Sequence, residues 1–151
     1  MNTIQRGNAT EAAVLNAFIR ADWHVWMPFG EGSACDLIVG WGHHLIRVQC
    51  KSGRVRNGCV VFNGHSTNHG RGRGSYHGRA DVFGVSVPGS TEVFVIPVVE
   101  VPLNACSLRL TPTLNNQRRG VRLADPYRFE NWEPEELVRR AEEATMVAGV
   151  L

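Results

Sequence analysis

The sequence predicts an α/β fold in which a mixed central sheet is flanked by one helix near each end of the chain. Apolar residues recur at helical spacing in residues 9–21 and again after residue 132. Between these segments, short runs of alternating apolar and polar residues are separated by glycine-rich turns, which is typical of strands. The length of 151 residues suits one domain, and we expect residues 1–151 to form it.

The first predicted element is the helix over residues 9–21. Its apolar stripe, at i, i+3 and i+4 spacing, consists of Leu15, Phe18 and Ile19. Asn8 or Thr10 is suited to cap the N-terminus of this helix. Either cap places Glu11 in the first turn, where a carboxylate interacts favourably with the helix dipole.

The predicted strands follow in order along the chain. They cover residues 23–29, 35–39, 44–52, 59–62, 81–87, 92–99 and, as a short piece, 108–110. Gly40 and Gly42 separate two of them, so residues 35–39 and 44–52 are expected to pair as a hairpin. Successive side chains of residues 44–52 point to opposite faces. One face carries Arg47, Gln49 and Lys51.

The last predicted element is a helix over residues 132–149. Pro134 is suited to its first turn, and three glutamates near its start interact favourably with the N-terminal end of the helix dipole. Its apolar side consists of Leu137, Ala141, Ala144 and Ala148.

Export, membrane insertion and a disulfide framework are not expected. The longest largely apolar run, residues 93–99, spans seven residues, whereas a membrane-spanning helix needs about 20. Residues 1–7 lack the apolar stretch of a secretory signal, so we expect a cytoplasmic protein. The four cysteines form no C-x-x-C pair, and we expect free thiols rather than disulfides or a zinc site.

Positive charge is concentrated in the middle of the chain. Residues 53–79 contain five arginines, three histidines and no acidic residue, and residues 63–79 are expected to form a flexible basic loop. Such a stretch suits a polyanion such as DNA. The predicted phosphate contacts are Arg47, Arg54, Arg56, Arg71, Arg73 and Arg79, with a second strip at Arg118, Arg119 and Arg122.

Two motifs in this region have alternative interpretations. Tyr76 either stacks on a base or packs beneath the basic loop. His65-x3-His69 with Cys59 suggests zinc, but further ligands at a suitable spacing are lacking.

The candidate catalytic motif is Asp36 followed, thirteen residues later, by Gln49-Cys50-Lys51. Paired strands can bring these groups together, as phosphodiester hydrolysis with Mg²⁺ requires. Asp36 would hold the metal, Gln49 would offer its amide oxygen, Cys50 its backbone carbonyl, and Glu11 would complete the site. Lys51, the only lysine among sixteen basic residues, would orient the nucleophile or balance charge on the phosphorane.

These residues resemble the signature of the PD-(D/E)XK nuclease superfamily, in which an acid on one strand precedes (D/E)-x-K on the next and a helix often carries a Glu. The matching residues are Glu11, Asp36, Gln49 and Lys51, with Cys35 in place of the usual Pro and Gln49 in place of the middle carboxylate. The V-Q-C-K segment is similar to the V-Q-x-K version found in group I intron homing endonucleases. The similarity touches residues 7–127. Archaeal-type Holliday junction resolvases share the same core.

The resemblance implies a restriction endonuclease-like core and a Mg²⁺-dependent DNA endonuclease of homing type, with Mn²⁺ as a substitute metal. It implies four catalytic residues, Glu11, Asp36, Gln49 and Lys51. Two alternatives stay open: a Holliday junction resolvase acting on four-way DNA junctions, and a non-catalytic DNA-binding module that lost the metal because of Gln49. A chain this small has one active site, so cutting two strands implies a homodimer or a larger symmetric assembly.

Overall fold

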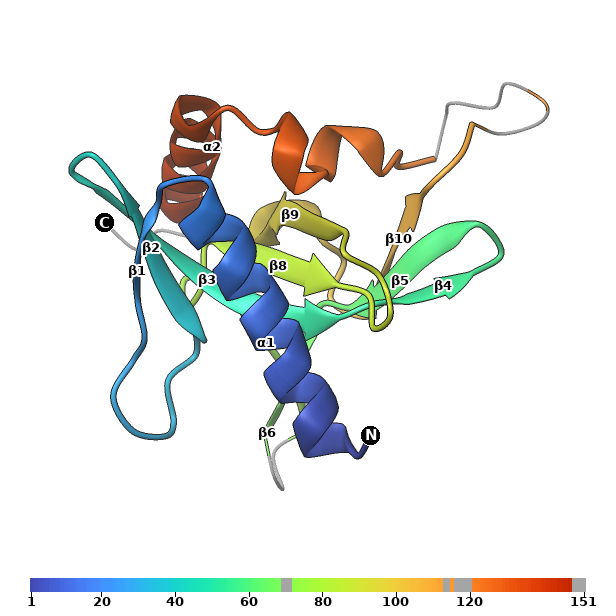
Figure 1. The fold of residues 1–151 in the computed structure, drawn as a ribbon, viewed down its shortest axis with the longest axis horizontal. Coiled ribbons are helices and arrows are strands. Elements are labelled where there is room, and N and C mark those ends of the chain that lie inside the picture. Colours follow the sequence, from blue (N-terminus) through green and yellow to red (C-terminus); the bar gives the residue numbers. More distant parts are fainter. Residues whose placement is uncertain (69–71, 113–114, 116–120, 148–151) are drawn as a thin grey trace.

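The computed structural model describes residues 1–68, 72–112, 115 and 121–147 (Figure 1). A five-stranded sheet forms its centre, with the strands in the order β1–β2–β3–β8–β9. These strands are β1 (His24–Trp26), β2 (Leu37–Trp41), β3 (His44–Ser52), β8 (Val82–Ser86) and β9 (Val93–Pro97). β3 and β8 pair in parallel, and the other pairs in this sheet are antiparallel. The predicted mixed sheet is confirmed.

The two helices, α1 (Thr3–Arg20) and α2 (Pro134–Val147), pack on the same face of this sheet. Val14 and Phe18 of α1 and Leu137 of α2 are buried in one apolar cluster. The sheet contributes to that cluster Leu37, Val39, Ile46, Val48, Val82, Val93 and Val95. Because these side chains belong to alternate strand positions, the helices cover one face of the sheet, and the opposite face packs against another layer of the protein.

A second, three-stranded sheet covers the opposite face, where the sequence indicated no separate layer. Its order is β10–β5–β4, with β4 (Arg54–Arg56), β5 (Cys59–Asn63) and β10 (Ala105–Arg109). Phe62 and Leu108 of this sheet pack with Phe83 and Ile96 of the central sheet. The described residues also form three short 3₁₀ turns: η1 (Val98–Glu100), η2 (Asp125–Tyr127) and η3 (Phe129–Asn131).

The first helix begins six residues before its predicted start, so the predicted caps are wrong. The Asn2 side chain accepts a hydrogen bond from the Gln5 backbone N–H at 2.9 Å, and the Gln5 side chain accepts one from the Asn2 backbone at 2.9 Å. This reciprocal pair is a capping box, and it starts the helix at Thr3. Glu11 consequently lies in the middle of α1, away from the helix dipole's positive end.

β3 has the predicted bounds, whereas β1 and β2 differ from prediction. β1 is limited to three residues, and β2 contains Gly40, the glycine predicted to end that strand. A Cβ at Gly40 would lie 2.8 Å from the Trp26 ring, so this glycine makes room for the tryptophan instead of breaking the strand. Gly42 has a φ of 60° and forms the turn between β2 and β3.

The predicted loop over residues 63–79 is largely a β-hairpin. β6 (His65–Asn68) and β7 (Gly72–Ser75) pair antiparallel, with His65 opposite Ser75. The ends of three other elements differ slightly from their predicted positions. β9 gives way to η1 after Pro97, β10 starts at Ala105, and α2 is described to Val147, so residues 148–149 of the predicted helix lie outside the described part.

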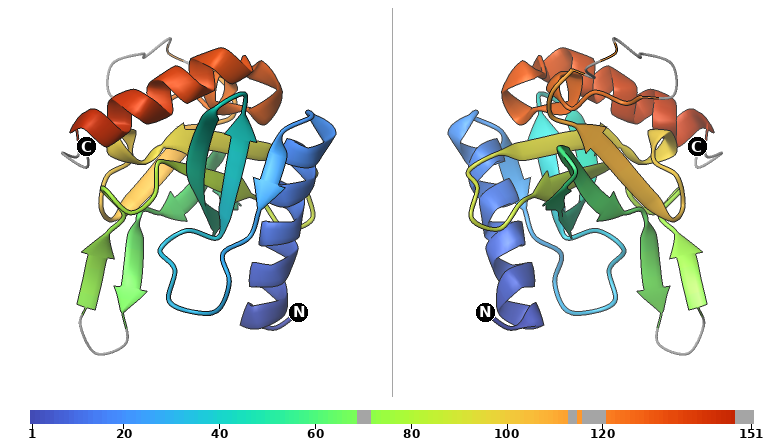
Figure 2. Two further views of the ribbon diagram at one scale, coloured as in Figure 1. Left: turned by 90° about the vertical axis from the view of Figure 1, so that its left-hand side faces the viewer. Right: turned by 90° about the vertical axis from the view of Figure 1, so that its right-hand side faces the viewer.

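Three segments project from the same side of the molecule: the N-terminal end of α1, the connection between β1 and β2, and the β6–β7 hairpin (Figure 2). The four cysteines are free thiols, as expected. Within the described part of the chain, neither helix is long and apolar enough for a bilayer crossing.

Gly84 of β8 faces α1, and a Cβ there would lie 2.6 Å from Cγ1 of Val14. We expect Gly84→Ala to lower the free energy of unfolding by about 1–3 kcal/mol, because overpacking must push the helix away from the sheet. Urea denaturation measures this change.

Gly7→Ala is the matched control, because nothing lies within 4 Å of a Cβ at this helical position. It should raise the free energy of unfolding by about 0.5–1 kcal/mol through helix propensity. Equal stability of Gly84→Ala and the unsubstituted protein would contradict the tight packing of α1 on β8.

Candidate active site

Asp36 is fastened directly to β3. Its Oδ2 accepts a hydrogen bond from the Cys50 backbone N–H at 2.9 Å, and its own backbone N–H donates to the Val48 carbonyl at 2.9 Å. The residue stands just before β2, next to Leu37, which pairs with Val48. The predicted approach of Asp36 to the Gln49-Cys50-Lys51 segment is thus present in the backbone hydrogen bonding.

Glu11 approaches the same point from α1. A surface cavity of about 390 Å³ is lined by both Glu11 and Asp36 and by the connection between β1 and β2. Burial raises the pKa of Glu11, and the nearby Asp36 carboxylate raises it further. Burial also raises the pKa of Asp36, although the Cys50 hydrogen bond and the Lys51 charge oppose this change. Both carboxylates therefore lose favourable hydration in the folded chain, and a cation between them would compensate.

The Cys50 thiol lies partly buried on the helix-facing side of β3. Burial raises its pKa far above the usual range, and the Asp36 and Glu11 carboxylates raise it further. The thiol therefore stays protonated, and only the backbone of Cys50 is available to a hard metal ion.

Lys51 is held by groups that the sequence did not associate with it. Its ammonium donates to Asn63 Oδ1 at 3.1 Å, to the His65 carbonyl at 2.8 Å and, more weakly, to the Tyr76 hydroxyl at 3.5 Å. It also lies 4.7 Å from the centre of the Tyr76 ring, within the range of a cation–π contact. Burial lowers the pKa of Lys51 to about 8, despite the opposing effect of Asp36.

Tyr76 packs inside the protein, so the alternative in which its ring stacks on a DNA base is not what the structure shows. Its side chain is buried, and its ring meets Phe83 edge-on with centres 5.5 Å apart. Asn63 lies before the β6–β7 hairpin in the sequence, and Tyr76 lies after it. Their separation in sequence, without a common motif, is why sequence reasoning missed their contact with Lys51.

Gln49 follows the predicted alternation, and its Nε2 lies 3.5 Å from the Cys50 carbonyl, a long contact. Its amide oxygen as a metal ligand stays a prediction. Among the described residues, no group of three or more His, Cys, Asp or Glu side chains is arranged to hold a metal ion. The predicted donors are instead two carboxylates, one amide and one backbone carbonyl. Such oxygen donors fit Mg²⁺ or Mn²⁺ and exclude a zinc–thiolate centre.

Arg47 is engaged within the protein. Its guanidinium and backbone N–H donate to the buried Asp81 carboxylate at 2.8–3.2 Å, and Nη1 donates to the Gly78 carbonyl at 2.9 Å. The Thr145 hydroxyl of α2 also donates to Asp81, at 2.8 Å. These contacts give Arg47 a structural role, and its predicted phosphate contact stays untested.

The other predicted DNA contacts fall into several groups. Arg54, Arg56 and Arg79 are exposed. Arg122 donates to the Glu100 carbonyl and to Cys106 Sγ, and so has partners inside the protein. Three further positions lie outside the described residues: Arg71, Arg118 and Arg119. For Arg73, only the backbone is described. His69 of the zinc alternative is also outside the described part.

Comparison with known proteins gave one family and a structural neighbour. The family model of the PD-(D/E)XK endonucleases matches residues 1–130. Among solved structures, a bacterial homing endonuclease, I-Ssp6803I, matches with a TM-score of 0.73 and 22% sequence identity. The match covers 95% of this chain and 99% of that chain, so the two share a fold over nearly their whole lengths. No curated protein matched.

Lys51 generates a testable pH dependence of stability. Its pKa of about 8 in the folded protein lies below its ordinary value of 10.5, so the unfolded chain binds more protons between these values. Stability contributed through Lys51 should therefore rise with pH across that interval. Urea denaturation at pH 7 and pH 10 should show the unsubstituted protein gaining stability relative to Lys51→Met.

Because Lys51 is the only lysine, no second lysine contributes to this difference. A stability difference between the two proteins that is the same at both pH values would show that Lys51 is not desolvated as the structure indicates.

Proposed function

This chain belongs to the PD-(D/E)XK endonuclease family, and from that premise we propose that it is a Mg²⁺-dependent DNA endonuclease of homing type that hydrolyses phosphodiester bonds. One observation carries the proposal. The backbone N–H of Cys50 holds Asp36 beside Glu11 on one side and within the electrostatic reach of Lys51 on the other. Two carboxylates and one ammonium converging at one point suit phosphodiester hydrolysis.

The oxygen donors of this chain would hold the metal. The Asp36 and Glu11 carboxylates, the Gln49 amide oxygen and the Cys50 backbone carbonyl provide hard ligands, and a Mg²⁺ or Mn²⁺ ion supplies charge neutralisation and an activated water when bound. The Gln49 amide has to turn its oxygen toward the site, since its nitrogen lies nearer the Cys50 carbonyl. Asp36 needs no such movement, because its second oxygen is free of the Cys50 hydrogen bond.

Lys51 supplies a positioned hydrogen-bond donor. The Asn63 and His65 oxygens and the Tyr76 ring fix the ammonium at the base of the β6–β7 hairpin. The N–H that makes only the long contact with the Tyr76 hydroxyl can turn to the attacking water or to a phosphate oxygen on which charge develops. The chain offers no other lysine for this role.

DNA would lie on the side from which α1, the β1–β2 connection and the hairpin project (Figure 2). The exposed Arg54, Arg56 and Arg79 are available to backbone phosphates. Arg71 and Arg73 of the hairpin region, and Arg118, Arg119 and Arg122, complete the predicted contacts. One site per chain and two strands to cut make a symmetric homodimer the simplest working assembly.

The decisive experiment measures nicking of supercoiled DNA with Mg²⁺, with Mn²⁺ and with EDTA. We expect cleavage with either metal and none with EDTA. Asp36→Ala and Lys51→Ala should each reduce the cleavage rate by about 100-fold or more, because each removes a charge that acts on the reacting phosphate. DNA affinity, read by gel shift, should change little.

Glu135→Ala is the matched control, since Glu135 is an exposed carboxylate in the first turn of α2. Absence of nicking with both metals would leave the non-catalytic DNA-binding module as the better reading. Selective cutting of a four-way junction over a linear duplex of matched sequence would favour the junction resolvase.

Metal binding itself predicts a shift in thermal stability. The raised pKa of Asp36 means that ionising this group costs stability in the folded protein at neutral pH. Asp36→Asn should therefore be at least as stable as the unsubstituted protein without metal. Added Mg²⁺ should raise the Tm of the unsubstituted protein and leave that of Asp36→Asn nearly unchanged, as scanning fluorimetry can show.

A further inference from the structure

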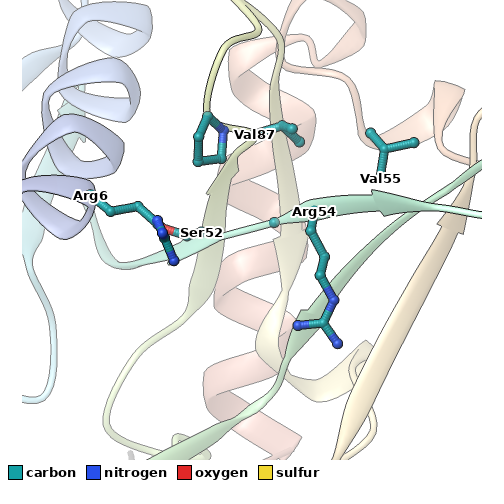
Figure 3. A pocket seen from close by; sticks show the side chains of 7 residues that line it. Arg6, Ser52, Arg54, Val55 and Val87 are labelled. Carbon is teal, nitrogen blue, oxygen red and sulfur yellow. The ribbon is translucent and has the colours of Figure 1, made fainter. Parts of the chain in front are cut away.

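A second cavity, of about 480 Å³, lies next to the candidate active site between α1, the β3–β4 junction and the residues after β8 (Figure 3). Arg6 reaches it from α1 toward Ser52, and Arg54 reaches it from β4. No acidic residue lines the cavity. Two guanidinium groups from distant parts of the sequence thus border one space without an opposing charge.

Both arginines are exposed and have no side-chain partner among the described residues. Six arginines in the described part differ, because their guanidinium groups bind acceptors of the protein: Arg47, Arg109, Arg122, Arg128, Arg139 and Arg140. Arg20, Arg56 and Arg79 are exposed as well, but they do not line this cavity. Arg6 and Arg54 therefore offer unsatisfied donors and uncompensated charge, which suit an anion.

Two elements, α1 and the β3–β4 segment, connect this cavity to the candidate active site. The Thr10 and Ser52 hydroxyls are 2.5 Å apart and join α1 to the end of β3. Thr10 precedes Glu11, and Ser52 follows Lys51. Arg6 lies about 7.5 Å along the helix from Glu11, at 1.5 Å per residue. Arg54 lies about 10 Å along the strand direction from Lys51, at about 3.3 Å per residue.

These distances are short on the scale of a DNA strand. Successive nucleotides of one strand advance about 3.4 Å along the duplex axis, so a phosphate bound in this cavity would lie within a few nucleotides of the Asp36 site. Val55, Val87 and Pro88 add apolar lining to the cavity. Apolar lining with charged donors suits a deoxyribose and its phosphate.

We propose that Arg6 and Arg54 form a phosphate subsite that holds one DNA backbone phosphodiester within a few nucleotides of the bond that is cut. The inference rests on the proposed function, and it names Arg6 as a DNA-binding residue that the sequence did not suggest. Because both guanidinium groups contact the same phosphate, they act as one binding unit.

The test measures DNA binding in EDTA, where no cleavage occurs, by fluorescence anisotropy over a range of salt concentrations. Arg6→Ala and Arg54→Ala should each weaken binding about tenfold and reduce the slope of log Kd against log salt by about one. The double variant should also reduce the slope by about one, because a single phosphate is lost. Arg20→Ala, which removes one charge from the other end of α1, should keep the original slope.

A set of duplexes, each with one neutral methylphosphonate linkage, provides the second readout. One linkage should weaken binding of the unsubstituted protein and leave Arg6→Ala unaffected. An unchanged slope for Arg6→Ala, or a slope reduced by about two in the double variant, would overturn the shared subsite.

The two proposals can fail separately. A protein that shows the expected slopes but never cuts DNA with metal would keep the subsite and lose the endonuclease function. A protein that cuts DNA while Arg6→Ala binds exactly like Arg20→Ala would keep the function and lose the subsite.

Discussion

The hydrogen bond from the Cys50 backbone N–H to Asp36 Oδ2 is the contact on which the candidate site depends. It joins a side chain just before β2 to the backbone of β3, and it holds the carboxylate in place while one oxygen stays available. Since Gln49, Cys50 and Lys51 are consecutive on β3, fixing Asp36 there sets its position relative to all three. Glu11 is the one remaining group of the site, and it is supplied by α1. The packing of Val14 on Gly84 keeps α1 close to the sheet.

This arrangement is costly to the folded chain. Two carboxylates are partly buried near each other with raised pKa values, and a lysine is desolvated enough to lower its own pKa to about 8. Such groups are tolerated in folded proteins mainly where a ligand or a reaction uses them. By contrast, the buried Asp81 is surrounded by donors from Arg47 and Thr145 and stabilises the junction of β3 and α2. The two aspartates differ in their hydrogen bonding: both oxygens of Asp81 have donors within the protein, whereas one oxygen of Asp36 is free of the Cys50 hydrogen bond.

The sequence predicted the parts of the fold that depend on local pattern. The bounds of β3, the presence of most strands, the pairing of β2 with β3 and the approach of Asp36 to the Q-C-K segment were correct, since alternation and spacing determine them. Strands at residues 59–62 and 108–110 were predicted, but their separation into a second sheet was missed, because it depends on tertiary packing. The β6–β7 hairpin was missed because its polar strands lack an apolar period. The helix start was wrong because the Asn2–Gln5 capping box, and not Asn8 or Thr10, begins the helix. The contacts of Lys51 with Asn63 and Tyr76 arise from tertiary packing alone.

A single lysine at the centre of the site has a practical meaning for anyone handling this protein. Amine-directed dyes and cross-linkers react with the neutral form of an amine, and a lysine pKa of about 8 provides that form under mild conditions. Apart from the N-terminal amine, Lys51 is the only aliphatic amine in the chain. An amine-directed label that reacts with a lysine of this chain would therefore sit in the candidate active site, and none of the four cysteines offers an exposed alternative.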